Sequence, residues 1–212
     1  MIDGPTFLVF LAAAFTLAVL PGPGMFYVLA RTLHGGRREG ILSTVGTAIA
    51  GLVHTVAAAL GVSAILATSA TAFAVVKWAG VAYLIYLGVR TLLDRHEPAQ
   101  RATEAPPAPD ASTSRGGALR QGIVAEVLNP KTALFFLSFL PQFVTPDGAV
   151  FAQFVLLGAI TTLLTSGVDL AVAFTAAPLS KLLVRSRGVR QVQRYGTGGA
   201  LIALGVYVAR TR

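Results

Sequence analysis

Pro21-Gly22-Pro23-Gly24 and Asn129-Pro130-Lys131 interrupt two long apolar segments that lie about half the chain apart. A proline inside a helix removes one backbone N–H and clashes with the carbonyl four residues before it. We therefore predict a broken helix at each motif, with the carbonyls of Leu17, Val19 and Glu126 deprived of their usual partners. At membrane depth, non-helical backbone is tolerated only where it is buried in protein or lines a polar cavity. Such interruptions in both halves of a chain are typical of a transport site.

The composition is that of a membrane protein. The chain has 212 residues, of which 54% are hydrophobic and only 12% are charged, against roughly 25% charged in an average soluble domain. Crossing a bilayer takes about 20 apolar residues, and runs of that length occupy residues 5–32, 40–66, 72–93, 118–144, 150–176 and 191–209. We predict an all-α integral membrane protein with six transmembrane helices in one domain, residues 1–212. A soluble helical bundle, the alternative, would need far more charged surface.

Basic residues gather in three of the predicted loops, which sets the orientation. The loop after the first span holds Arg31, Arg37 and Arg38, and the loops after the third and fifth spans hold five each, whereas the loops after the second and fourth spans hold none. Because Lys and Arg accumulate in cytoplasmic loops, we expect those three loops inside and both termini outside, against the charge of Arg210 and Arg212. The net charge of +8 is thereby explained without a nucleic-acid partner, since the basic residues lack aromatic interleaving.

Signals for processing, cofactors and metals are missing from the sequence. Residues 1–6 contain no positively charged stretch, so we expect no cleavable signal peptide. Zero cysteines leave no disulfide and no thiolate metal site. His34, His54 and His96 show no paired ligand spacing, and we predict neither a metal nor a cofactor.

The two halves of the chain resemble each other. With residues 94–117 taken as a linker, repeat 1 (1–93) and repeat 2 (118–212) align at the proline motifs, and Leu87-Gly88-Val89 aligns with Leu204-Gly205-Val206. Each half has three spans, an odd number, so the second must enter the membrane from the opposite side, and the alternating loop charges agree. Inverted repeats place a substrate site near mid-membrane at their interface. Chance similarity between apolar segments is the alternative.

The interrupted backbone predicts what the site recognises. Half-helices that begin near Gly24 and Lys131 would present free N–H groups, and the half-helices before them would present free carbonyls. A zwitterionic amino acid offers a carboxylate to the first and an ammonium to the second. Proline kinks that only shape packing remain the alternative. The predicted substrate-binding or pathway residues are Pro21, Gly22, Pro23, Gly24, Asn129, Pro130 and Lys131.

Three ionisable groups within the spans are candidates for carrying a proton. A charge at the bilayer centre costs on the order of 3 kcal/mol, so each of them calls for an explanation. Asp169, deep in the fifth span, is the first candidate, with a structural carboxylate as the alternative. Glu126 could serve instead unless it lies near the interface, and His54 could titrate or donate a hydrogen bond between helices.

Small residues spaced four apart in the second span predict helix packing. Gly46 with Ala50, and Thr47 with Gly51, form small-xxx-small pairs that let two helices approach closely. We expect this face of the span to be buried against another helix.

At this point the motifs resemble a known family. The Pro-Gly-Pro-Gly motif, the pattern Lys77-x-x-Gly80-x-x-Tyr83-Leu84-x-x-Leu87-Gly88 and the stretch 129–143 together are similar to the LysE/RhtB family of bacterial amino-acid exporters, over nearly the whole chain. The resemblance implies a proton-driven plasma-membrane exporter of amino acids or related small metabolites, with six helices and dimerisation. Glu126 departs from the family pattern, in which that position is usually polar and uncharged.

The leading hypothesis is thus proton-coupled export by alternating access. A passive channel and an exporter of a non-amino-acid solute are the alternatives. A membrane-embedded enzyme would need clustered nucleophiles, bases or metal ligands, which the spans do not offer. The sequence leaves open which solute is carried.

Overall fold

The computed structural model describes residues 4–20, 22–68, 70–93, 117–145 and 148–185, and residues 191, 195–196, 198–199, 202–203, 205–206 and 209–210 near the C-terminus. These residues are helical or connect helices, and no strand occurs among them. The elements are α1 (Gly4–Val19), α2 (Pro23–Thr68), α3 (Ala70–Leu93), α5 (Gly117–Val127), α6 (Pro130–Ser138), the 3-10 helix η1 (Leu140–Phe143) and α7 (Val150–Arg185). The all-α prediction is confirmed for this part of the chain.

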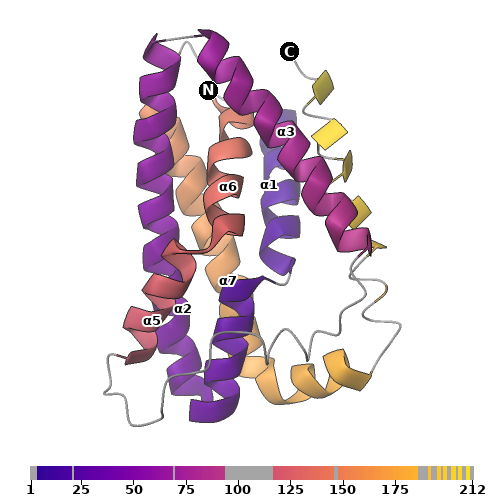
Figure 1. The fold of residues 1–212 in the computed structure, drawn as a ribbon. Helices are drawn as coiled ribbons and strands as arrows, with labels where there is room; N and C mark the ends of the chain where they lie inside the picture. Colours follow the sequence, from indigo (N-terminus) through magenta and orange to yellow (C-terminus); the bar gives the residue numbers. More distant parts are fainter. Residues whose placement is uncertain are drawn as a thin grey trace.

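Helix α2 is a hairpin of two arms. Gly36 has φ 79° and ψ −178°, a left-handed φ that glycine adopts without steric cost. The first arm runs to one end of the bundle and the second arm returns along its whole length (Figure 1). Across the turn, Gly40 lies so close to Thr32 that a Cβ would collide with the Thr32 hydroxyl. The two apolar spans predicted on either side of residues 33–39 are therefore joined by a tight turn.

Helix ends coincide with both proline motifs. Helix α1 ends at Val19 and α2 begins at Pro23, while α5 ends at Val127 and α6 begins at Pro130. Both interruptions lie about halfway along the bundle, and the chain passes through them in opposite directions (Figure 1).

Two of the three carbonyls that we predicted to lose their partners, those of Leu17 and Glu126, are bonded. The Leu20 N–H donates to the Leu17 carbonyl at 3.2 Å, and the Asn129 N–H donates to the Glu126 carbonyl at 3.1 Å. The last turn of each helix tightens and supplies a donor three residues on, which is how many helix ends satisfy such groups.

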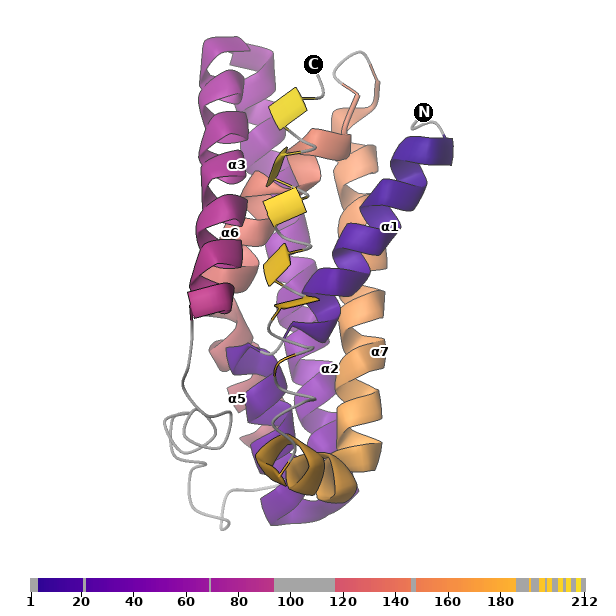
Figure 2. The ribbon, with the colours of Figure 1, turned by 90° about the vertical axis from the view of Figure 1, so that its right-hand side faces the viewer.

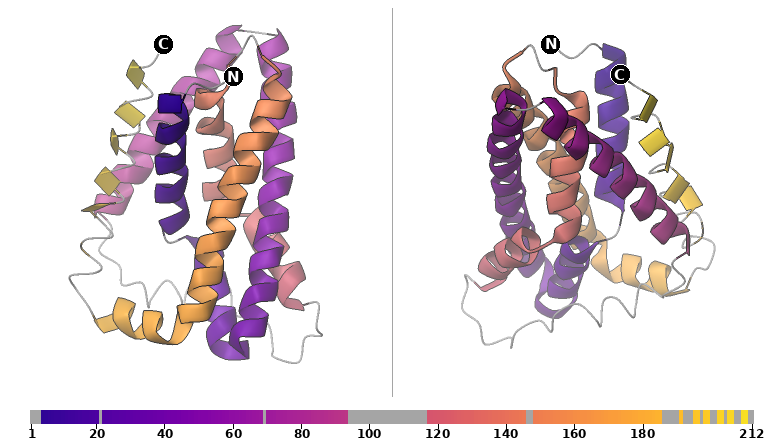
Figure 3. Two further views of the ribbon diagram at one scale, coloured as in Figure 1. Left: turned by 180° about the vertical axis from the view of Figure 1, so that it is seen from behind. Right: turned by 45° about the horizontal axis from the view of Figure 1, so that its top comes forward.

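The helices pack around a core of aromatic rings. The second arm of α2 lies between α5 and α7, α1 packs on α7, and α3 packs on α6 (Figures 2 and 3). Phe135 stacks on Phe139 at 4.4 Å, and Phe10 meets Phe143 edge-on at 5.4 Å. These are favoured geometries for ring pairs. The cluster fills the end of the bundle where α1 begins.

The outer surface is strongly apolar. Leu8 on α1 and Leu163 on α7 are 66% and 72% exposed, and other exposed apolar side chains occur along every long helix. Soluble monomers rarely expose apolar patches of this extent. Within the described residues, the stretches Pro23–Ala64 and Val150–Ala176 are long and apolar enough to cross a membrane.

Helix α3 packs against the described residues within 198–206, here called the C-terminal segment, and each of the two contributes glycines to the contact. A Cβ on Gly88 would lie 2.9 Å from the Gly198 carbonyl oxygen and 2.7 Å from Cγ1 of Ile202. A Cβ on Gly205 would lie 2.8 Å from Cγ1 of Ile85 and 3.5 Å from the Val81 carbonyl oxygen. Each segment therefore approaches the other closely at a glycine, Gly88 on α3 and Gly205 on the C-terminal segment.

Candidate functional site

A small polar cavity lies between the two interruptions. Its volume is about 50 Å³, and α1, both arms of α2, α5, α6 and α7 all contribute to its lining. Leu20, Gly22 and Gly24 line it at the first interruption, and Glu126 and Asn129 at the second. The cavity thus joins residues that are about a hundred positions apart in the sequence.

Glu126, in the last turn of α5, is one of the two carboxylates that line this cavity. Its residue is 7% exposed, and its two carboxylate oxygens accept hydrogen bonds from different donors. The Asn129 amide donates to Oε2 at 3.0 Å, and the Thr132 hydroxyl donates to Oε1 at 2.5 Å. Oε2 also lies against Gly24, where a Cβ would collide with it. The carboxylate therefore occupies space that is open only because residue 24 is glycine.

His54 supports the second interruption from behind. Its Nε2 lies 3.0 Å from the Glu126 carbonyl oxygen, and since a carbonyl only accepts, Nε2 must be the protonated nitrogen. The ring also packs near Phe136, with centroids 6.1 Å apart. His54 thus makes the interhelical hydrogen bond considered above, and it acts on the backbone of Glu126.

One face of α7 is lined with hydroxyl groups and ends in Asp169. Asp169 is 2% exposed, and its Oδ2 lies 3.2 Å from the Thr47 hydroxyl, which also lies 3.0 Å from the Thr44 carbonyl. The Thr162 hydroxyl is buried at the cavity and has no hydrogen-bond partner in the described part of the chain. The hydroxyl-bearing lining residues of α7 are Thr161, Thr162, Thr165 and Ser166.

The predicted site residues divide into two groups. Gly22, Gly24, Asn129, Glu126 and Asp169 all line the cavity, and Glu126 is buried within the protein. Pro23 is exposed, and Pro21 lies outside the described residues, as do the side chains of Pro130 and Lys131.

Sequence reasoning missed most of the hydroxyl groups. Thr161, Thr165 and Asp169 recur every four residues, as do Thr162 and Ser166, and this helical spacing could have revealed the polar face of α7.

The small residues of the second span do pack as predicted. Gly46 faces Gly122 of α5 closely enough that a Cβ would lie 3.1 Å from the Gly122 Cα.

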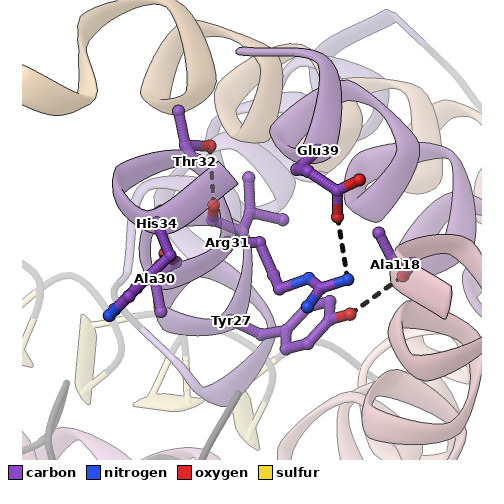
Figure 4. A network of polar contacts seen from close by, with 8 residues as sticks. Tyr27, Ala30, Arg31, Thr32, His34, Glu39 and Ala118 are labelled. Atoms are coloured by element: carbon purple, nitrogen blue, oxygen red, sulfur yellow. Dashed lines mark hydrogen bonds and ion pairs between the residues drawn. The ribbon is translucent and has the colours of Figure 1, made fainter. Parts of the chain in front are cut away.

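A second polar cluster lies at the hairpin end of the bundle. Arg31 is buried, not a loop residue as predicted, and its Nη2 forms an ion pair with Glu39 at 2.8 Å (Figure 4). Figure 4 also shows the Tyr27 hydroxyl, which donates to the Ala118 carbonyl at 2.9 Å and so links α2 to α5. This cluster stands apart from the cavity.

The lining can bind a small polar solute but does not gather metal ligands. Within the described ranges, no three His, Asp or Glu side chains come together as a metal site would require. Carboxylates, hydroxyls and an amide instead converge on one space, which suits ammonium and hydroxyl groups.

The chain is similar in sequence to known membrane and efflux proteins. A membrane protein of Vibrio cholerae is 28% identical over 99% of both chains. The homoserine/homoserine lactone efflux protein of Salmonella typhimurium is 28% identical over 96% of this chain and 95% of the relative. The leucine efflux protein of Klebsiella pneumoniae is 31% identical over 68% of each. No solved structure matches the chain.

The family profile described as LysE type translocator matches residues 15–212. That match covers both proline motifs and every residue that lines the cavity. The chain belongs to the LysE type translocator family.

Proposed function

We propose that this protein exports amino acids or related small metabolites across the bacterial plasma membrane, and that the polar cavity is its binding site. The observation that carries the proposal is the convergence of both interruptions on one buried polar space. The names of the relatives, homoserine/homoserine lactone efflux protein and leucine efflux protein, support amino acids as the substrate class. The loops after the first, third and fifth spans would face the cytoplasm, with both termini outside.

In this proposal, α1 with the first arm of α2 forms one broken membrane helix, and α5 with α6 forms another. The two belong to inverted repeats of three helices. Their opposite chain directions support this arrangement. So do the glycine contacts between α3 and the C-terminal segment, because the alignment that places Gly88 on Gly205 also places Val81 on Gly198 and Ile85 on Ile202. The Gly88 contacts are therefore the counterparts of the Gly205 contacts, as a two-fold relation requires.

Transport would proceed by alternating access. A water molecule needs roughly 10–15 Å³ of cavity volume. The cavity, at about 50 Å³, therefore has room for only a few waters. A solute as large as leucine therefore requires the helices to separate. The small volume of the cavity supports a carrier over an open passive channel. Asp169, Glu126 and His54 remain the candidates for coupling that movement to a proton.

Efflux from whole cells tests the proposal. Cells with and without the protein are loaded with dipeptides, and the amino acids released by hydrolysis are measured in the medium over time. We expect at least one amino acid to leave faster from cells that contain the protein, and a protonophore to remove the difference. Equal efflux of every amino acid would refute the substrate class, and efflux that ignores the protonophore would refute proton coupling.

A matched variant separates coupling from binding. Asp169→Asn keeps the shape of the side chain and removes its ionisation. If Asp169 carries the proton, this variant should exchange substrate across the membrane yet fail to concentrate it in response to a proton gradient. Unchanged gradient-driven uptake in vesicles would assign the coupling to another group.

A further inference from the structure

We propose that Glu126 binds the ammonium group of the exported solute, so that the transporter requires a cationic amino group and does not require a carboxylate. This inference rests on the proposed export function and names the chemistry of its substrate. It reverses the expectation that the helix N-termini at the two interruptions receive a carboxylate from the solute.

The first step concerns what already occupies the anion-binding position. Oε2 of Glu126 lies against Gly24 in the first turn of α2, and both its oxygens accept from residues at the beginning of α6, Asn129 and Thr132. The leading turns of two helices favour negative charge, and here the protein supplies that charge itself. A carboxylate of the solute at the same position would meet a like charge in a buried setting, where repulsion is weakly screened.

The second step concerns the partners of the Glu126 carboxylate within the described residues. Its donors, an amide and a hydroxyl, are both neutral, and among the described residues the only ion pair joins Arg31 to Glu39, away from the cavity. An ionised carboxylate offers about four acceptor positions, of which these two donors use two. A primary ammonium brings three donors and a positive charge, and such charge-assisted hydrogen bonds are stronger than neutral ones.

The third step concerns two of the helix-end carbonyls. Two of the helix-end carbonyls that we expected to be free to hold an ammonium are already bonded, Leu17 to the Leu20 N–H and Glu126 to the Asn129 N–H and His54. The Glu126 carboxylate is a stronger acceptor than a carbonyl and lines the same space.

An orphan hydroxyl completes the description of the ligand. Thr162 is 7% exposed, lines the cavity and has no hydrogen-bond partner within the described residues. A buried polar group without a partner is costly, and a hydroxyl, carbonyl or amide of the solute would satisfy it. The structure thus assigns the site to small primary amines with a polar, uncharged or charged second group, which includes amino acids together with their amides, esters and lactones.

Ligand binding to the purified protein in detergent tests this assignment without crossing a membrane. The twenty amino acids are first ranked by thermal stabilisation. The N-acetyl derivative, the amide and the methyl ester of the best ligand are then compared with it by equilibrium binding. We expect the N-acetyl derivative, which lacks the positive charge, to bind at least tenfold more weakly, and the amide and ester to bind at least as well as the acid.

A variant locates the effect. Glu126→Gln keeps the length of the side chain, and we expect it to lose at least tenfold in affinity for the free amine while its affinity for the N-acetyl derivative stays the same. Asp169→Asn removes the other carboxylate of the cavity; loss of the preference for the free amine in this variant, with the preference kept in Glu126→Gln, would assign the ammonium to Asp169 and overturn the proposal. The ligand series on the unmodified protein decides the matter even if Glu126→Gln does not fold.

The contradicting outcomes are distinct. Equal binding of the N-acetyl derivative and the free amine, or failure of the amide and ester to bind, would overturn the role of Glu126 and leave export intact. The absence of both binding and efflux for every amino acid would overturn the proposed function, and this inference with it.

Discussion

The two interruptions face the same cavity with different chemistry. At the first, between Val19 and Pro23, the chain presents glycines, and its backbone comes close to whatever lies opposite. At the second, where α5 ends at Val127 and α6 begins at Pro130, it presents Glu126 from the last turn of α5 and Asn129 from the connection, and His54 bonds to the Glu126 carbonyl. The carboxylate of the second occupies the space that a side chain at the first would fill.

The difference shows how two similar segments divide one task. A Pro-Gly-Pro-Gly motif offers room and main-chain polarity but no charge, whereas the segment around Asn129 offers charge and side-chain donors but less room. Neither would form this cavity alone. The two interruptions are complementary, so a change at one should be felt at the other, and this dependence can be tested.

The largest expected effect comes from filling the space at the first interruption. In Gly24→Leu the new side chain displaces the Glu126 carboxylate from Asn129 and Thr132, and each hydrogen bond to a charged group is worth about 1.5–3 kcal/mol. We expect a loss of about 3 kcal/mol or more in stability and no efflux, measured by thermal unfolding in detergent and by transport. Gly61→Leu is the control, because nothing lies within 4 Å of a Cβ there.

A double-mutant cycle then breaks or confirms the complementarity. Gly24→Ala and Glu126→Ala are compared singly and together. Because the alanine at 24 costs stability by displacing the carboxylate, it should cost about 1–2 kcal/mol less once that carboxylate is gone. Additive losses would mean that the two interruptions act independently.

The next effect concerns positions where the halves are alike. Gly88→Ala and Gly205→Ala each introduce a Cβ that meets the opposite segment at under 3.0 Å, and overpacking of this kind costs about 1–3 kcal/mol. Gly88→Ala should be the more harmful, since it meets a carbonyl oxygen as well as a side chain, whereas the closest atom to Gly205 belongs to the flexible Ile85. Both losses are measured by thermal unfolding.

Gly199→Ala provides the baseline for that pair, because its Cβ would meet nothing within 4 Å. It should be neutral or slightly stabilising, as alanine favours helix over glycine. If Gly88→Ala and Gly205→Ala behave like this control, the packing between α3 and the C-terminal segment is looser than described.

A smaller effect is expected at the support of the second interruption. His54→Phe removes the donor to the Glu126 carbonyl, which keeps the Asn129 N–H, so one hydrogen bond worth about 1 kcal/mol is lost. His54→Gln can still donate and should recover part of the loss. Identical melting temperatures for the two variants would show that the ring's packing, not its N–H, is what matters.

The smallest effect should come from the link at the hairpin end. Tyr27→Phe deletes the hydroxyl that donates to the Ala118 carbonyl, at a cost of about 0.5–1 kcal/mol. Because this bond links α2 to α5 at the hairpin end, we expect it to affect the relative movement of these helices. The change in efflux rate should then be larger than the change in stability implies. Wild-type efflux in Tyr27→Phe would exclude the bond from the moving interface.

Local rules predicted much of the architecture from the sequence. The helix ends at Val19 and Val127 follow from proline's missing N–H, and the all-α membrane class follows from composition. Gly22, Gly24 and Asn129 were identified as site residues because a break forces backbone or short polar groups toward a cavity, and they do line it.

Contacts between distant segments were out of reach. Nothing in the sequence around Glu126 indicates that it meets Gly24, since the contact depends on how α5 packs beside α2. Arg31 was placed in a loop for a similar reason: its burial depends on Glu39 returning to it across the Gly36 turn. The spacing of the hydroxyls on α7 was visible, by contrast, and was overlooked.

The ion pair between Arg31 and Glu39 suggests which parts of the protein should move together. The ion pair spans the turn at Gly36, whose φ is positive, and the close approach of Thr32 to Gly40 also joins the two arms of α2. In the proposed alternating-access cycle we therefore expect the arms of α2 next to this turn to move as one rigid unit, and access from that end to open along the contacts of this unit with α5 and α7. The distance between two probes placed across those contacts should change during transport. The distance between two probes placed on either side of the turn should stay constant.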